Sequence, residues 1–174
     1  LLLDQPSRLT PKEIRDKAML ELLYATGMRV SELINLKITD VNLTMNYILC
    51  RDVSKERVIP IENVAKMALE NYIKSVRESI SHGSMFLFTN MKGQPMTRQG
   101  FWKLIKAYAA KAGIDKDITP HMIRHSFASH LVSMCRLKAV QEMLGHSDIS
   151  TTQVYLNFGV AKMRDVYMKA HPRH

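Results

Sequence analysis

Side chains that can handle a phosphate group recur along the C-terminal half of the sequence. They are His121, Arg124, His146 and Tyr155, and Arg29 joins them from far upstream. Arginine and histidine can hold the non-bridging oxygens of a phosphodiester by hydrogen bonds and charge while negative charge builds there. A tyrosine hydroxyl can attack the phosphorus once a neighbouring group accepts its proton, a role that histidine can share near neutral pH. Together these residue types indicate phosphoryl transfer.

Nothing in the sequence around these residues indicates a metal or nucleotide cofactor. No acidic cluster suits Mg²⁺, no Cys/His spacing suits zinc, and no GxxxxGK[ST] loop is present to bind an NTP. Cys50 and Cys135 lie far apart, which is typical of reduced thiols in a cytoplasmic protein. We therefore expect chemistry without cofactors in the cytoplasm.

The charge balance points to a polyanionic partner. The 174 residues carry a net charge of +9, which favours nucleic acid, although a basic soluble protein without such a partner has the same balance. No apolar run reaches the ~18 residues of a membrane span. The length predicts one domain with a substantial core.

Helix signals place the C-terminal candidates near helix ends. Thr119 and Pro120 predict a helix start, and His121 and Arg124 then share one face of its first turns. A following helix ends at Gly145, directly before His146, and the next helix carries Tyr155. These signals predict that the polar groups gather where helices begin and end.

The N-terminal region predicts two consecutive helices that position Arg29. Thr10 and Glu13 form a capping box for a helix that ends near Gly27, and a short helix then begins with Arg29 in its first turn. An arginine beside helix N–H groups favours an anion site, although a surface arginine with no role is the alternative.

A β-hairpin follows, with strands predicted over residues 47–50 and 57–61 and a basic tip over residues 51–56. Pro60 favours an edge position for the second strand because proline cannot donate a ladder hydrogen bond. The tip can enter a DNA groove, or it can simply be solvated.

Two longer helices complete the predicted elements. One spans residues 64–80 and the other is capped by Thr97 and ends at Gly113, with Arg98 placed to bind a phosphate. We interpret Trp102 and Tyr108 as packing residues. The core side of the first helix is predicted to comprise Val64, Met67, Ala68, Ile73 and Val76.

Several stretches resemble the motifs of one known family. They are ATGMRVSEL around Arg29, KERVIPI in the hairpin, TPHMIRHSFASHL around His121 and Arg124, and AVQEMLGHSDISTTQVY around His146 and Tyr155. The sequence is similar over essentially all of its length to the catalytic domain of tyrosine recombinases, the phage integrase family, and most of all to the Xer type. The resemblance implies a mainly α fold with a small antiparallel β-sheet (α+β).

The resemblance also implies a role for each candidate. Arg29 and Arg124 would bind the scissile phosphate, His121 would help to activate the nucleophile and His146 would hydrogen-bond the phosphate. Tyr155 would attack to give a 3′-phosphotyrosyl link and a free 5′-hydroxyl, with strand exchange and religation following without metal or ATP.

Partners and domain organisation follow from the same resemblance. Family members act as homo- or hetero-tetramers on paired double-stranded DNA sites, and a C-terminal helix, here residues 160–170, often docks on the neighbouring subunit. Members of the family usually have a separate helical DNA-clamping domain before the catalytic one. The resemblance covers only the catalytic domain, so we expect residues 1–174 to be that domain alone.

The hairpin departs from the family pattern, which resembles GKGxKxR with its first lysine as general acid. The corresponding position holds Asp52, and an aspartate cannot replace the electrostatic role of that lysine. Either Lys55 reaches into the site and acts as the general acid, which we prefer, or Arg51 replaces the missing lysine imperfectly, or cleavage is impaired. Candidate DNA contacts are Arg51, Lys55, Arg57 and Arg98.

Other functions fit part of the same evidence. The missing lysine fits a DNA-binding protein with impaired catalysis, and the Arg/His/Tyr set fits a type IB topoisomerase-like enzyme. The spacing of His146 and Tyr155 favours the recombinase. A structural protein without a DNA role fits these motifs poorly.

Overall fold

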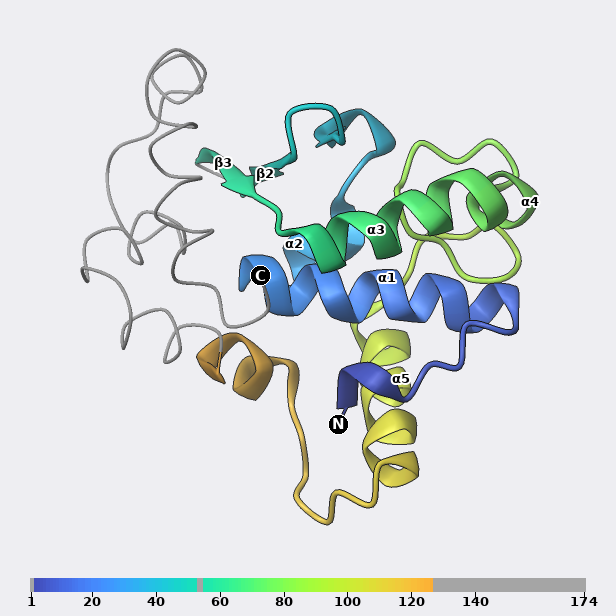
Figure 1. Ribbon diagram of the computed structural model, residues 1–174, viewed down its shortest axis with the longest axis vertical. Coiled ribbons are helices and arrows are strands. Elements are labelled where there is room, and N and C mark those ends of the chain that lie inside the picture. Colours follow the sequence, from blue (N-terminus) through green and yellow to red (C-terminus); the bar gives the residue numbers. More distant parts are fainter. Residues whose placement is uncertain (1, 53–54, 127–174) are drawn as a thin grey trace.

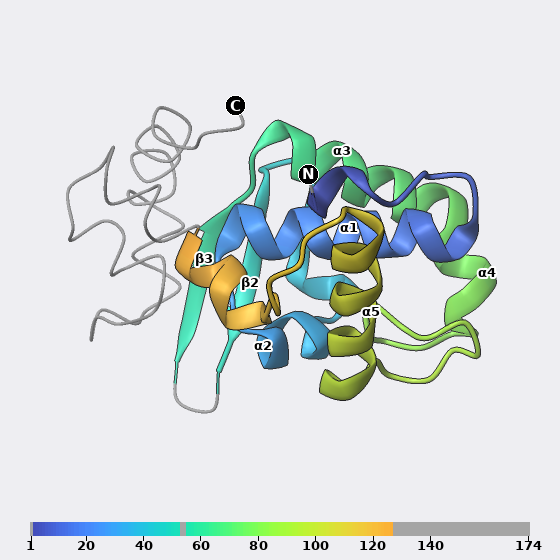
Figure 2. The same ribbon diagram turned by 90° about the horizontal axis from the view of Figure 1, so that it is seen from below.

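The computed structural model describes residues 2–52 and 55–126, and these form a group of helices with a small antiparallel sheet at one side (Figures 1 and 2). The expected fold class is confirmed. In chain order the elements are η1 (Leu2–Asp4), α1 (Pro11–Thr26), α2 (Val30–Asn35), η2 (Ile38–Asp40), β1 (Val41–Asn42), β2 (Tyr47–Arg51), β3 (Glu56–Pro60), α3 (Asn63–Tyr72), the π-helical turn η3 (Ile73–Arg77), α4 (Glu78–Ser81) and α5 (Arg98–Lys111). Residues 120–126 are also helical. His146, Tyr155, Cys135 and the predicted helices beyond residue 126 lie outside the described residues.

Helix α1 runs through the middle of the described part, with α3 on one side and α5 on the other (Figures 1 and 2). Its N-terminus is capped as predicted, because Thr10 Oγ1 accepts a hydrogen bond from the Glu13 N–H at 3.2 Å. Gly27 closes it in the left-handed region at φ 59°, and its N–H donates to the Leu23 carbonyl at 2.9 Å. Both ends of the central helix therefore follow from local sequence.

Charged side chains inside the core join α1 to α5. Tyr108 Oη donates to Asp16 Oδ2 at 2.9 Å, and Arg15 binds the other Asp16 oxygen and the Thr89 carbonyl. Burying these groups is tolerated because each one is hydrogen-bonded. The interpretation of Tyr108 as a packing residue is confirmed, whereas Trp102 is 39% exposed with the Lys106 ammonium over its ring.

The sheet has the order β1-β2-β3, and all its pairs are antiparallel. Arg51 pairs with Glu56 at the end of the hairpin, and reciprocal backbone hydrogen bonds between Asp52 and Lys55 close the turn. Pro60 lies on β3, an edge strand, as the sequence predicted.

The predicted core face of α3 and its continuation was right at Val76 and wrong at Met67. Met67 is 69% exposed, and the buried side of α3 and its continuation comprises Ala65, Leu69, Tyr72, Val76 and Ile80. Apolar residues occur on both flanks of this helix, so the sequence alone did not determine which flank packs inward. Tyr72 decides it, because its ring stacks on Phe88 and its hydroxyl donates to the Leu87 carbonyl at 2.9 Å.

Within residues 2–52 and 55–126, no helix has both the length and the apolar character that crossing a membrane requires.

Candidate active site

Arg29 lies at the junction between α1 and α2. It is the N-cap residue of α2, with extended backbone angles, one position before the helical turn in which the sequence placed it. Its backbone N–H donates to Glu32 Oε2 at 2.6 Å, which fixes the start of the short helix. The Arg29 side chain remains 45% exposed.

Arg124 reaches the same junction from the helical residues 120–126. Thr119 caps this segment as predicted, because its Oγ1 accepts a hydrogen bond from the Met122 N–H at 3.2 Å. Arg124 Nη1 then donates to the Gly27 carbonyl at 2.6 Å, across 97 positions of sequence. The fold thus brings Arg124 next to the loop that carries Arg29.

The electrostatics of Arg124 reflect this proximity. Its partial burial lowers the pKa of its guanidinium, and the positive charge of Arg29 lowers the pKa further. Arginine stays protonated at neutral pH even so. Two cations that repel each other at the edge of the core form a site that favours an anion between them.

Glu32 and Arg57 form a buried support beneath the two arginines. Arg57 Nη1 and Nη2 donate to the two carboxylate oxygens of Glu32 at 2.6 and 2.9 Å. Burial alone would raise the pKa of Glu32, but the hydrogen bonds and charge of Arg57 outweigh that effect, and the pKa is lowered. Glu32 therefore stays ionised and links the hairpin to the start of α2.

Sequence reasoning missed Glu32. The signal that could have found it is its place in the third helical position after Arg29, where a glutamate caps the backbone of the preceding N-cap residue. Arg57, predicted to face DNA, is instead only 5% exposed, because its guanidinium is bound to Glu32. Its side chain supports the site from within.

The hairpin tip brings a carboxylate to Arg29. Arg29 Nη1 lies 2.9 Å from Asp52 Oδ2, and both side chains are nearly half exposed. Arg51 is held by acids of its own, since it hydrogen-bonds Asp40 and lies 2.6 Å from Glu56 Oε1. Lys55 sits across the turn from Asp52 and is half-buried.

The remaining predicted residues fall into two groups. His121 is exposed in the first turn of residues 120–126, three positions before Arg124, and Arg98 is exposed in the first turn of α5. His146 and Tyr155 lie outside the described residues. The structure thus brings Arg29 and Arg124 together, with His121 on the turn beside Arg124 and Asp52 on Arg29.

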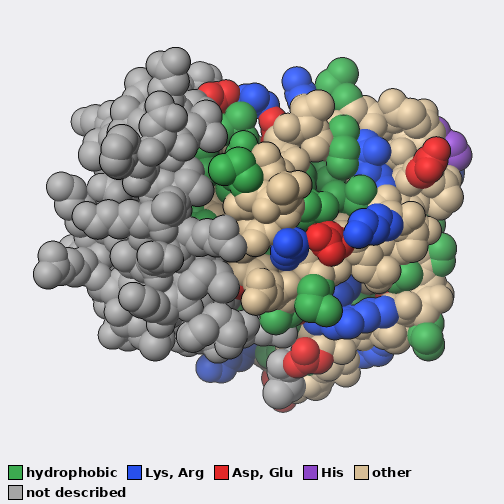
Figure 3. Space-filling view, turned by 45° about the horizontal axis from the view of Figure 1, so that its top comes forward, with side chains coloured by type: hydrophobic (Ala, Val, Ile, Leu, Met, Phe, Trp, Pro, Cys, Tyr) green, Lys and Arg blue, Asp and Glu red, His purple; other side chains and the backbone are tan. Residues whose placement is uncertain are grey.

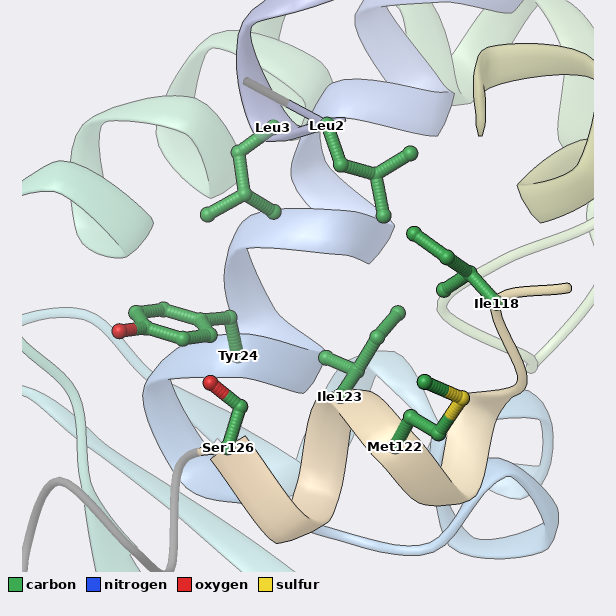
Figure 4. A pocket seen from close by; sticks show the side chains of 7 residues that line it. All are labelled: Leu2, Leu3, Tyr24, Ile118, Met122, Ile123 and Ser126. Carbon is green, nitrogen blue, oxygen red and sulfur yellow. The ribbon is translucent and has the colours of Figure 1, made fainter. Parts of the chain in front are cut away.

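An apolar hollow lies behind the helical residues that carry Arg124 (Figure 4). Leu2 and Leu3 of the N-terminal segment reach toward Ile123 and Met122 across a space of about 270 Å³. The full lining is Leu2, Leu3, Tyr24, Ile118, Met122, Ile123 and Ser126. This lining anchors the apolar face of the segment and offers no charged group for catalysis. Among residues 2–52 and 55–126, no group of His, Cys, Asp and Glu side chains is arranged to hold a metal ion.

Comparison with protein families gives a match over nearly the whole chain. The model of the phage integrase family matches residues 1–160. Tyrosine recombinase XerD of Halalkalibacterium halodurans is 51% identical over 178 aligned positions, which cover 99% of this chain and 59% of that protein. XerD of Listeria innocua is 47% identical and covers 99% and 60% respectively. The chain therefore spans about three fifths of the length of these relatives.

Solved structures show the same fold. The XerA recombinase superposes with a TM-score of 0.76 at 32% identity, covering 99% of this chain and 63% of that one. The XerH site-specific recombinase bound to its difH substrate gives 0.73 at 26% identity, covering 95% and 50%. The lambda integrase catalytic core gives 0.65 at 18% identity, covering 84% and 90%, which is a likeness of fold alone.

Proposed function

The chain belongs to the phage integrase family, with tyrosine recombinases of the Xer type among its relatives, and from this premise we propose that it is the catalytic domain of a site-specific DNA recombinase. The observation that carries the proposal is the hydrogen bond from Arg124 to the Gly27 carbonyl. It brings two arginines from distant parts of the sequence to one junction, which supports a role for both in holding a DNA phosphate. Residues 1–174 form the catalytic unit in this proposal.

The two arginines would bind the scissile phosphate. Guanidinium groups present several N–H donors in a fixed plane, so they can contact two non-bridging oxygens at once. Their contribution grows as negative charge accumulates on these oxygens in the transition state. Glu32 keeps the Arg29 backbone and Arg57 in place and so preorganises this part of the site.

Tyr155 would then attack the phosphorus while its proton passes to His121. A bond forms between the tyrosine oxygen and phosphorus, and the bond from phosphorus to the 5′-oxygen of the DNA breaks. The products are a 3′-phosphotyrosyl link and a 5′-hydroxyl. His146 would hydrogen-bond the phosphate throughout. Attack by the 5′-hydroxyl of a partner strand reverses the step and religates the DNA, so neither metal nor ATP is consumed.

The leaving 5′-oxygen requires a proton, and Lys55 is the better of two candidates. Hydrogen bonding to Glu56 and the charge of Asp40 raise the pKa of Arg51, which makes an already weak acid weaker. Lys55 belongs to the same turn as Asp52, which contacts Arg29. We assign it the role of general acid.

The DNA partner is a double-stranded recombination site, on which the protein would assemble as a homo- or hetero-oligomer. The relative XerH was solved bound to its difH substrate, which supports DNA as the ligand. The exposed side of α5 carries Arg98, Lys103 and Lys106 and can contact DNA phosphates, as can Arg51 and Lys55 at the hairpin tip.

The test uses a nicked suicide DNA substrate, which traps the covalent link because the nicked end cannot religate. The wild-type chain is expected to form a protein–DNA adduct that survives denaturation, whereas Tyr155→Phe forms none because no nucleophile remains. Tyr47→Phe is the matched control, since Tyr47 lies on β2 and its hydroxyl accepts a hydrogen bond from Asn42. An adduct in Tyr155→Phe would falsify the nucleophile assignment.

A DNA-binding protein with impaired catalysis is a second candidate, and the ion pair between Arg29 and Asp52 favours it, because this carboxylate takes up one of the two arginines. Binding of duplex DNA without an adduct from any nicked substrate would support this second function. Adduct formation would exclude it.

A further inference from the structure

The contact between Arg29 and Asp52 has a consequence for ligand binding. Asp52 Oδ2 lies 2.9 Å from Arg29 Nη1, and the two side chains are 42% and 45% exposed. Glu32 also approaches Arg29 Nη1, at 3.5 Å, but it is buried and bound to Arg57. Asp52 is thus the acid that meets Arg29 on its solvent side.

A carboxylate and a phosphate oxygen use the same donors of a guanidinium. Both are anionic acceptors, and both form short charge-assisted hydrogen bonds with arginine N–H groups. Arg29 is held at its backbone by Glu32 and lies close enough to Arg124 to lower the pKa of that residue. A phosphate oxygen that approaches Arg29 Nη1 therefore competes with Asp52 Oδ2 for the same N–H donors.

We propose that Asp52 is an internal competitor for the anion site at Arg29, and that a DNA phosphate gains Arg29 Nη1 only by displacing this carboxylate. The inference rests on the proposed function, in which Arg29 holds the scissile phosphate. Asp52 also offsets the repulsion between Arg29 and Arg124 in the DNA-free protein. It thereby sets the affinity of the site for its substrate.

The expected effect of removing this carboxylate is modest, because exposed ion pairs are weak and are screened by salt. Asp52→Asn keeps the size and polarity of the side chain but removes its charge. We expect it to strengthen phosphate binding at Arg29 about two- to fivefold at low ionic strength, with the gain shrinking at high salt.

The hairpin offers a matched control. Glu56 lies across from Arg51 at the same end of the hairpin, and its Oε1 is 2.6 Å from Arg51 Nε. Glu56→Gln removes one negative charge from the same turn without removing a partner of Arg29. Any gain that comes only from raising the net charge is therefore shared by both variants.

The experiment titrates the full chain with inorganic phosphate and follows the side-chain Nε–H signal of Arg29 by NMR, assigned by its loss in Arg29→Lys. We expect the phosphate concentration at half-saturation to fall about two- to fivefold in Asp52→Asn. In Glu56→Gln it should fall only by the smaller amount that the higher net charge causes.

Two outcomes would overturn the inference, and they are distinguishable. If the Arg29 signal responds to phosphate equally in Asp52→Asn and Glu56→Gln, Asp52 does not compete, and the phosphate site of the proposed function stands. If phosphate moves the Arg29 signal in no variant, Arg29 binds no phosphate, and the proposed function loses that residue together with this inference.

Discussion

At the scale of single residues, Glu32 joins the parts of the site. It accepts a hydrogen bond from the Arg29 backbone and binds both terminal nitrogens of Arg57. It is only 5% exposed, so its charge is stable because Arg57 neutralises it inside the protein. Since folding lowers its pKa from 4.5, the ionised form stabilises the protein above that pH, and this contribution is lost as the pH falls through the lowered value.

Glu32→Gln is expected to lower the free energy of unfolding by roughly 3 kcal/mol at neutral pH, because Arg57 keeps a buried charge without its partner. The difference from wild type should shrink as the pH falls through the lowered pKa of Glu32, because the protonated carboxyl resembles glutamine. Denaturant unfolding followed by circular dichroism over a series of pH values measures both effects.

The control for this prediction is Glu70→Gln. Glu70 is partly exposed, and its nearest ammonium groups, those of Lys66 and Lys74, lie 3.9 and 4.0 Å away. Exposed pairs of this kind contribute little, so this variant should unfold like wild type at each pH. A destabilisation by Glu32→Gln that stays constant down to acidic pH would show that the charge of Glu32 is not its source.

At the scale of elements, helix ends were predicted well and helix faces less well. Thr10, Gly27, Thr97 and Thr119 act as the caps or stops that the sequence indicated, because capping depends on residues within one turn. The buried face of α3 and its continuation was predicted correctly at Val76 but not at Met67, because it depends on which neighbours pack against it. Those neighbours, α1 and the segment around Phe88, come from other parts of the chain.

Leu69→Ala and Met67→Ala distinguish the two faces of α3. Leu69 is fully buried, so its truncation should cost about 2–5 kcal/mol of unfolding free energy through lost burial and a cavity. Met67 is 69% exposed, and its truncation should change stability by less than about 0.5 kcal/mol. Thermal or denaturant unfolding of the two variants compares them directly, and equal losses would contradict the observed face.

At the scale of the whole molecule, basic residues of the described part are interspersed with other residue types on one face. On the face in Figure 3, Lys and Arg side chains alternate with acidic and apolar ones and form no continuous patch. On this face the positive charges therefore act as separate contacts, each of small effect. A phosphate contact can be recognised by its effect on the salt dependence of DNA affinity.

Arg98→Ala should reduce the slope of log affinity for duplex DNA against log salt by about one unit, because each phosphate contact releases about one counterion. Lys74→Ala is the matched control. It removes one exposed charge from η3, which lies on the other side of α1 from α5 in both ribbon views. Filter binding over a range of salt concentrations measures the slope, and equal slopes for the two variants would remove Arg98 from the DNA-contacting surface.

By itself the sequence predicted the central helix with its ends, the two hairpin strands with Pro60 at an edge, and Arg29 and Arg124 as candidates of one site, while its resemblance to a known family predicted the fold class. The helix ends and the strands depend on local propensity, and the two arginines belong to a residue type that is suited to binding phosphate. The roles of His146 and Tyr155 remain predictions from the sequence.

Only the tertiary structure decided which charges meet. It placed Arg57 inside on Glu32, brought Arg124 to the Gly27 carbonyl and set Asp52 on Arg29. Such pairings join residues far apart in the chain, and their strength depends on distance and burial. Both quantities exist only once the chain has folded.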